Sequence, residues 1–153
     1  MIVEKELFMT KLNETRKIFI YLPDDYETSN KQYPVLYAFD GHNIFLDAHA
    51  TYGKAIHIQQ HIEKLGIDMI VVGQECSHVG NNRLKEYAPY SFYDPEYGSF
   101  EGQGEETMDF FVHELKPYID DHYRTKKTRK NTFIGGSSCG GLMALYAAYA
   151  YSN

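Results

Sequence analysis

The chain has 153 residues, 43% of them hydrophobic and 24% charged, a composition that predicts one packed domain spanning residues 1–153 and excludes an intrinsically disordered protein. The formal net charge of -6 repels phosphate groups and anionic lipid surfaces, so we expect neither nucleic acid nor a membrane as a partner. Only two cysteines are present, and the N-terminal segment lacks the basic and apolar regions of a signal peptide. We therefore expect a cytoplasmic protein.

Five short segments have the composition of β-strands. Two of them, residues 3–9 and 16–22, are separated by a short polar stretch, and a Pro-Asp-Asp turn ends the second, so they predict a hairpin. The mostly apolar runs at 34–39, 68–73 and 131–135 are typical of strands that are buried on both faces of a parallel sheet.

Three helical patterns alternate with the apolar strands. Apolar residues recur every three or four positions over 55–65, where Gly66 can end the helix, and again over 105–123, where we expect Pro117 to bend the helix. Residues 140–151 are apolar and rich in alanine, as in a helix buried against a sheet. The alternation predicts an α/β fold with helices on both faces of a mostly parallel sheet.

The most specific motif is Gly136-Ser137-Ser138-Cys139-Gly140, a G-x-S-x-G pattern between the last predicted strand and the last predicted helix. Strand, tight turn and helix form the context of the nucleophile elbow of serine hydrolases, in which glycines leave room for a strained and closely packed turn. The motif predicts Ser138 as the nucleophile and the backbone N–H of Cys139 as an oxyanion donor. The alternatives are an ordinary glycine-rich turn, or the Cys139 thiol as the nucleophile, displaced by one residue from the apex of the turn.

A second oxyanion donor usually comes from the loop after an earlier strand. The segment Asp40-Gly41-His42-Asn43 follows the strand predicted at 34–39, so we expect the backbone N–H of His42 to be that donor. A plain Asp-Gly turn with a solvated histidine is the alternative.

With these motifs the chain resembles the esterase branch of the α/β-hydrolases, which includes esterase D, enterochelin esterases, feruloyl esterases and S-formylglutathione hydrolase. The likeness is carried, in family order, by RKIFIYLPDDY (16–26), YPVLYAFDGHNIF (33–45), NRLKEYAP (82–89), ELKPYI (114–119) and FIGGSSCGGL (133–142). The resemblance implies an α/β-hydrolase-like three-layer sandwich and a carboxylic ester hydrolase that acts on a small-molecule ester without a cofactor or metal. It also implies that Ser138 is the catalytic serine and that the amides of His42 and Cys139 form the oxyanion hole.

A segment rich in polar and aromatic residues, from about Glu75 to Gly104, is predicted as a long loop, and loops of that length are usually functional. The resemblance makes the part around Asn82, Arg83 and Tyr87 a candidate substrate-side loop. A salt-bridged surface turn is the alternative for these three residues.

The catalytic acid and histidine of α/β-hydrolases follow the serine, whereas the residues after Ser138 include no Asp, Glu or His. The chain therefore looks like an N-terminal portion of the fold, truncated after the nucleophile helix, and we expect impaired activity. One alternative is a substitute base among the preceding histidines, such as His42 or His78. Others are an acyltransferase with the same elbow, and a non-catalytic fragment that acts as a binding or interaction module.

Two further features concern metal binding and self-association. His57 and His61 have the spacing of two zinc-binding imidazoles on a helix, but Ile58 replaces the glutamate of that motif, so we expect no metal there. The apolar strand at 131–135 would become an exposed edge in a truncated sheet, and such an edge favours homo-oligomers.

Overall fold

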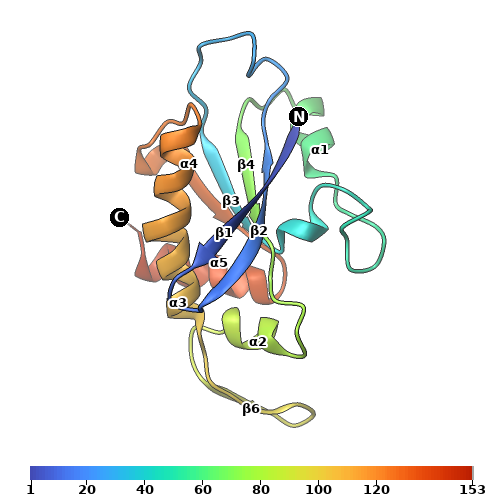
Figure 1. The fold of residues 1–153 in the computed structure, drawn as a ribbon, viewed down its shortest axis with the longest axis vertical. Coiled ribbons are helices and arrows are strands. Elements are labelled where there is room, and N and C mark those ends of the chain that lie inside the picture. The colour runs from blue at the N-terminus through green and yellow to red at the C-terminus, as the bar shows by residue number, and fades with distance from the viewer. Residues whose placement is uncertain (153) are drawn as a thin grey trace.

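The computed structural model describes residues 1–152, which are organised around a five-stranded sheet in the order β1-β2-β4-β3-β7 (Figure 1). The strands are β1 (Ile2–Met9), β2 (Glu14–Tyr21), β3 (Val35–Phe39), β4 (Ile70–Gln74) and β7 (Thr132–Gly135). β2 pairs antiparallel with β1 and β4, and β3 pairs parallel with β4 and β7. Four of the five strands therefore point in one direction, which confirms both the predicted hairpin and the mostly parallel sheet.

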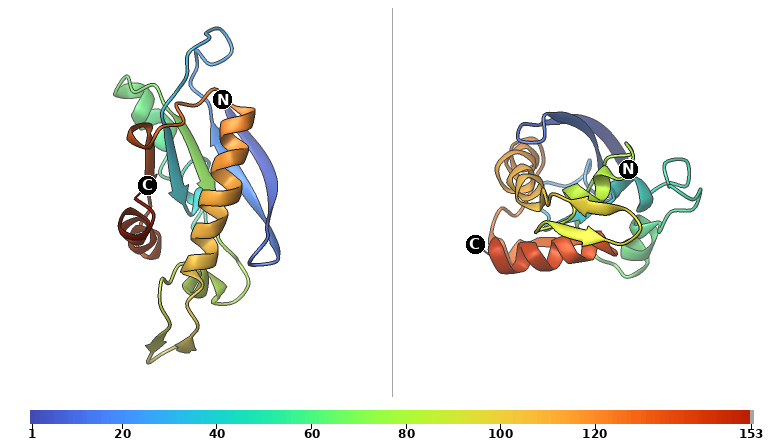
Figure 2. Two further views of the ribbon diagram at one scale, coloured as in Figure 1. Left: turned by 90° about the vertical axis from the view of Figure 1, so that its left-hand side faces the viewer. Right: turned by 90° about the horizontal axis from the view of Figure 1, so that it is seen from below.

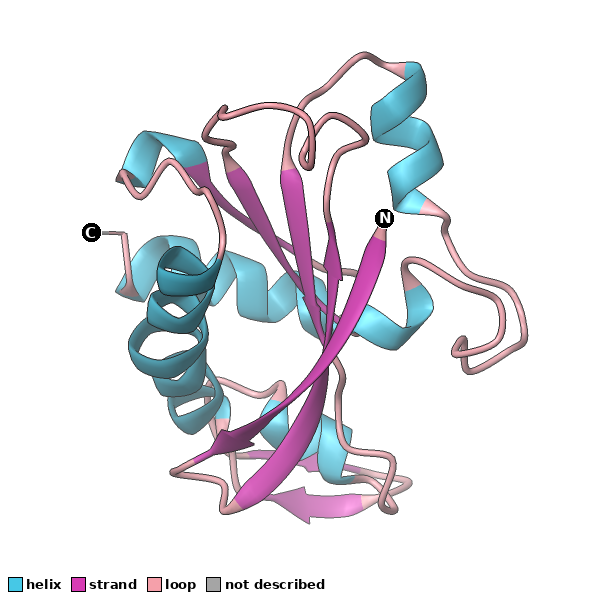
Figure 3. Ribbon diagram, turned by 45° about the horizontal axis from the view of Figure 1, so that its top comes forward, coloured by secondary structure: helices cyan, strands magenta, loops and turns pink. Residues whose placement is uncertain are grey.

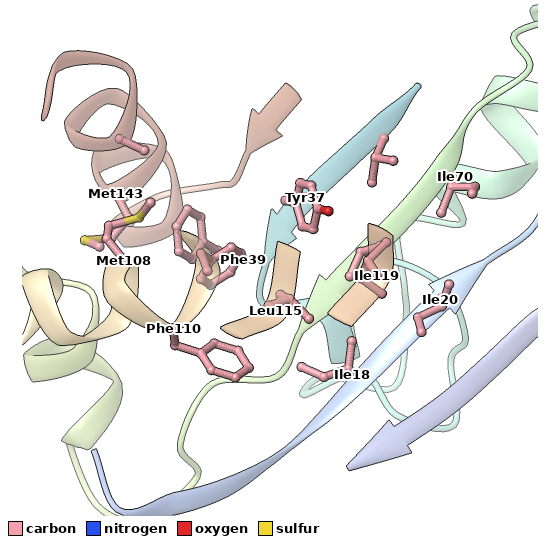
Figure 4. Packing of buried hydrophobic residues seen from close by; sticks show 14 of the residues in the cluster. Ile18, Ile20, Tyr37, Phe39, Ile70, Met108, Phe110, Leu115, Ile119 and Met143 are labelled. Atoms are coloured by element: carbon pink, nitrogen blue, oxygen red, sulfur yellow. The ribbon is translucent and has the colours of Figure 1, made fainter. Parts of the chain in front are cut away.

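Alternate residues of the central strands contribute to two separate hydrophobic clusters. In β2, Ile18 and Ile20 belong to the larger cluster, whereas Phe19 and Tyr21 belong to the smaller one. Because successive side chains of a strand point to opposite faces, the two clusters lie on opposite faces of the sheet. Figure 4 shows the larger cluster, where Leu115 lies over the sheet among the buried residues of the strands.

One long helical segment covers the larger cluster. It consists of α3 (Gly104–Asp109), the π-helical η2 (Phe110–Leu115) and α4 (Lys116–His122), which Figure 2 shows as one continuous coil. Pro117 lies in the first turn of α4, directly after the π-helical turn. Proline has no N–H to donate to the preceding turn of a helix. The π-helical turn before Pro117 changes the hydrogen-bond register, so the helix continues past the proline.

The opposite face of the sheet is covered by α1 (Ile58–Lys64) and by η1 (Gly41–Asn43), a 3-10 turn after β3. Gly66 follows α1 with a φ of 65°, as predicted for a glycine that ends a helix. The prediction that the helix starts at residue 55 was wrong, because His57 takes a left-handed conformation and the helix begins after it. Leu65, predicted to face inward, is 71% exposed. Helices on both faces make three layers, which Figure 3 shows, and confirm the predicted α/β sandwich.

β7 and the following helix α5 (Cys139–Ala150) are less covered than predicted. Met143 and Ala147 of α5 join the larger cluster, but Tyr149 is 84% exposed on the other side of the helix. In β7, Phe133 is 47% exposed, because within residues 1–152 this strand pairs only with β3. The prediction that β7 is buried on both faces was therefore wrong, and the prediction of an apolar edge is confirmed.

The predicted long loop at 75–104 contains regular structure. It includes α2 (Asn82–Glu86) and a small hairpin of β5 (Phe92–Asp94) and β6 (Gly98–Phe100), which Figure 1 shows projecting from the body of the molecule. A second 3-10 turn, η3 (Arg129–Asn131), precedes β7. Among the helices of residues 1–152, none combines the length and the apolar composition needed to cross a membrane.

Candidate active site

Ser138 lies at a sharp turn between β7 and α5. Its backbone has φ 80° and ψ -110°, a conformation that residues with a side chain rarely adopt, and α5 begins at the next residue. The residue is exposed, so its hydroxyl is accessible to solvent. Strained backbone of this kind persists only where the surrounding structure maintains it.

Close packing of glycines maintains the turn. A Cβ added to Gly136 would lie 2.4 Å from the carbonyl carbon of Gly140, and a Cβ added to Gly140 would lie 2.9 Å from the Cβ of Phe39. Neither position has room for a side chain unless the backbone shifts. The two glycines that the sequence singled out are therefore required by the backbone of the turn itself.

The turn after β3 lies directly beside this elbow. Asp40 takes a left-handed conformation with φ 57°, and η1 follows it. The position where a Cβ of Gly140 would lie is 3.4 Å from Asp40 Oδ2, so the two predicted parts of the site adjoin. Within residues 1–152, neither the N–H of His42 nor that of Cys139 donates a backbone hydrogen bond. Both amides are therefore available to a bound oxyanion.

A polar network holds the Asp40 turn. Arg83 donates from Nε to Asp40 Oδ1 at 2.8 Å and from Nη2 to Asp40 Oδ2 at 2.7 Å, and these hydrogen bonds raise the pKa of the Arg83 guanidinium. The N–H of Asp40 donates to the Tyr87 hydroxyl at 3.2 Å, and that hydroxyl donates to Gln74 Oε1 at 2.7 Å. Tyr87 is fully buried, and burial raises its pKa. Arg83 and Tyr87 thus stabilise the turn that carries His42.

The residues of the predicted substrate-side loop make structural contacts in the folded chain. Arg83 is salt-bridged, as the alternative interpretation held, although its partner is the turn beside the elbow. Asn82 begins α2, where its N–H donates to the carbonyl oxygen of Val79 at 3.1 Å. A direct role of Asn82, Arg83 and Tyr87 in substrate binding stays a prediction.

A buried ion pair joins α2 to strand β2 of the sheet. Arg16 of β2 pairs with Glu86, whose second carboxylate oxygen accepts the N–H of Ser77 at 3.1 Å. Arg16 is 7% exposed and Glu86 is 3% exposed. The sequence analysis missed Glu86, Gln74 and the role of Asp40, because no local pattern distinguishes these polar residues from solvated ones.

An apolar groove of about 700 Å³ opens next to the elbow. Its walls come from α2, the β5–β6 hairpin and the exposed side of α5, and they include Tyr87, Tyr90, Cys139, Leu142 and Tyr146. Cys139, the residue after the candidate nucleophile, lines this groove. Tyr90 and Tyr146 face each other there with ring centroids 6.1 Å apart.

The histidines do not contact Ser138 by hydrogen bonds in the described part of the chain. His42 Nε2 lies 3.1 Å from Thr51 Oγ1, and His78 Nε2 lies 3.0 Å from Glu75 Oε1. A substitute base therefore stays a hypothesis without a contact in this structure.

His57 lies before α1 rather than in it. Its ring nitrogens contact the carbonyl oxygen of Phe45 and the carboxylate of Asp47. The spacing between His57 and His61 thus does not produce two metal ligands on one helical face.

Comparison with known proteins identifies the family. A family model described as "Putative esterase" matches residues 9–153. The chain belongs to this esterase family. It is 30% identical over 151 residues to the uncharacterized protein YjcH of Bacillus subtilis, covering 98% of this chain and 56% of YjcH. It is 32% identical over 136 residues to an esterase of Mycobacterium tuberculosis, covering 88% of this chain and 26% of the esterase.

The esterase-family chain is also similar to a solved structure. An IroE-like serine hydrolase from Shewanella oneidensis superposes with a TM-score of 0.77 at 27% identity, over 96% of this chain and 46% of the hydrolase. This similarity confirms the α/β-hydrolase-like fold. The chain spans about half the length of YjcH and of the Shewanella hydrolase, and about a quarter of the mycobacterial esterase.

Proposed function

We propose that this esterase-family chain carries the nucleophile and the oxyanion hole of a serine carboxylic ester hydrolase. The observation that carries the proposal is the exposed Ser138 in a strained turn at the start of α5. The N-terminal end of a helix has a partial positive charge, which favours the negative charge that develops on a substrate oxygen. The amides of His42 and Cys139, which donate no backbone hydrogen bond to any of residues 1–152, would donate to that oxygen.

The proposed reaction has two steps. The Ser138 oxygen attacks the carbonyl carbon of the ester, the bond to the alcohol oxygen breaks, and the serine proton leaves with the alcohol. Water then attacks the acyl-enzyme, which releases the carboxylic acid and returns a proton to Ser138. The apolar groove beside Cys139 favours a small-molecule ester with an apolar or aromatic group.

We further propose that the 153-residue chain is an impaired hydrolase. Its sequence after Ser138 offers no acid or histidine, and loss of the base in a serine hydrolase lowers kcat by about four to six orders of magnitude. The amides would still leave a residual rate of about 10³-fold over water. A non-catalytic interaction module is the competing function.

Labelling with a fluorophosphonate separates the two functions. We expect slow labelling of the wild-type chain that Ser138→Ala abolishes, together with weak turnover of a p-nitrophenyl ester. Ser137→Ala is the matched control, because Ser137 is exposed and adjacent but precedes the strained position, and it should label like wild type. Absence of labelling after long incubation, in a folded wild-type chain, would favour the non-catalytic module.

We also propose that copies of this chain associate through the β7 edge. The support is the exposed Phe133 and the side of β7 that pairs with no other strand within residues 1–152, because an uncovered apolar edge is a template for pairing with another strand.

A further inference from the structure

Two histidines and a cysteine from separate parts of the chain come together next to the oxyanion turn. His42 comes from η1, whereas Cys76 and His78 follow β4. One potential ligand atom from each of the three side chains lies within 4.8 Å of the other two. The imidazole rings of His42 and His78 lie nearly perpendicular to each other, at an interplanar angle of 82° and a centroid distance of 4.7 Å.

His42 is not explained by ordinary packing. The residue is 2% exposed, and its Nδ1 atom has no hydrogen-bond partner among the described residues. Its other ring nitrogen, Nε2, is occupied by Thr51 Oγ1 at 3.1 Å. A buried polar atom without a partner is costly and calls for an explanation, and a ligand at Nδ1 would provide one.

His78 is oriented in the way that metal-bound histidines are. Its Nε2 atom lies 3.0 Å from Glu75 Oε1, which leaves Nδ1 as the ring nitrogen without a hydrogen bond to another described residue. Metal-binding histidines usually donate their second ring N–H to a carboxylate or another oxygen, which fixes the ring and its tautomer. Thr51 and Glu75 therefore have the positions of outer-shell partners for the two imidazoles.

The donor set selects the kind of metal. Two imidazoles and a cysteine sulfur suit zinc, whereas magnesium and calcium require oxygen ligands. Burial raises the pKa of the Cys76 thiol to about 12, so zinc binding has to displace the thiol proton. Tetrahedral zinc places its nitrogen and sulfur ligands about 3.5 Å apart, so the three groups would have to close from their present spacing. His78 can make that movement because its side chain is 55% exposed, and the same exposure provides an entry path for the ion.

We propose that His42, Cys76 and His78 bind a Zn²⁺ ion and that the bound ion inhibits the esterase. His42 is also the candidate oxyanion donor, so an ion on its ring would attract the substrate oxygen away from the amides or block its approach. The inhibition rests on the proposed function, whereas the zinc site does not.

Cobalt titration tests the site without using activity. We expect the metal-free chain to bind one equivalent of Co²⁺ with a near-ultraviolet thiolate-to-cobalt charge-transfer band, and Zn²⁺ to displace it. Cys76→Ser should abolish the band, and His78→Ala should weaken binding at least tenfold. Cys139→Ser is the matched control for the other thiol, and His61→Ala is the control for an exposed histidine elsewhere. Both should bind like wild type.

The outcomes that overturn the proposal are separate for its two parts. A wild-type chain without the charge-transfer band, or a band that survives in Cys76→Ser, overturns the zinc site. His78→Ala keeps this test valid if Cys76→Ser fails to fold, because His78 is exposed and its removal should not affect the core. Zinc at saturation that leaves fluorophosphonate labelling of Ser138 unchanged overturns the inhibition. Absence of labelling without zinc contradicts the proposed function and with it the inhibition, whereas the zinc site is decided by the cobalt titration alone.

Discussion

The two edges of the sheet are built in opposite ways. β1 carries Glu4, Lys5 and Glu6 along its exposed length, and Glu4 contacts Lys17 of β2 at 3.4 Å and His49 at 2.9 Å. β7, with the sequence TFIG, has no charged residue and exposes Phe133. Charged side chains discourage pairing of an edge with another strand. Within residues 1–152, one edge of the sheet is therefore protected by charged side chains and the other is not, and the candidate nucleophile follows the uncharged edge.

The two sides also differ in what holds them together. On the β1–β2 side, the buried pair of Arg16 and Glu86 joins the sheet to α2. On the β7 side, the elbow depends on contacts between backbone atoms at Gly136 and Gly140. The ion pair is therefore sensitive to substitutions that remove a charge, whereas the elbow is sensitive to substitutions that add a side chain to a glycine.

The largest effect is expected on the β1–β2 side, from Glu86→Ala. The substitution removes the buried partner of Arg16 and leaves it only the more exposed Glu14, which should lower the free energy of unfolding by about 3 kcal/mol. Urea denaturation measures the change. Glu101→Ala is the control, because Glu101 is exposed and should change stability by no more than about 0.5 kcal/mol. A loss below about 1 kcal/mol for Glu86→Ala would show that this side does not depend on the pair.

A smaller loss of stability with a larger loss of function is expected on the β7 side, from Gly136→Ala. The new Cβ would lie 2.4 Å from the backbone of Gly140, so the elbow must open, at a cost of about 2–3 kcal/mol. Fluorophosphonate labelling of Ser138 should be lost in protein that remains folded by circular dichroism.

Gly135→Ala is the matched control for this substitution, one residue earlier in the chain. The nearest atom to a new Cβ there is Leu36 Cδ1 at 3.6 Å, an ordinary contact, so we expect a change of less than about 1 kcal/mol and unchanged labelling. Equal effects of the two substitutions would contradict the packing argument for the elbow.

The smallest effect in energy is expected from adding a charge to the unprotected edge. Phe133→Lys should raise the dissociation constant of self-association at least tenfold, or about 1.4 kcal/mol, as measured by sedimentation equilibrium. Phe8→Lys is the control on β1, since Phe8 is 52% exposed on an edge that is already charged, and it should leave association unchanged. Wild-type chain that stays monomeric at high concentration would contradict the association itself.

Several features were predictable because the physics that produces them is local. The apolar runs predicted as strands correspond to β3, β4 and β7, and the recurrence of apolar residues over 105–123 corresponds to α3, η2 and α4, since side-chain periodicity follows from the geometry of a strand or helix. The turn at the G-x-S-x-G motif was predictable for the same reason, because the glycines that make room for it lie two residues to either side of Ser138. Its catalytic role stays a prediction.

The supports of the site were not predictable, since their partners are distant in the chain. Arg83 and Asp40 are separated by 43 positions, and Arg16 and Glu86 by 70. Nothing within either neighbourhood indicates the pairing. The exposure of Leu65, in a stripe predicted to face inward, was likewise decided by the start of α1 after His57.

The sequence by itself determined the order of the five sheet strands and of the main helices, the tight turn at Ser138 and the resemblance to esterases, because each depends on neighbouring residues. Only the tertiary structure decided which polar side chains meet. It brought His42 next to Cys76 and His78, and Arg83 against Asp40, and it left Phe133 on an open edge. The physical reason is that charge, hydrogen-bonding capacity and burial act between groups that are close in space, and the folded sheet sets those distances.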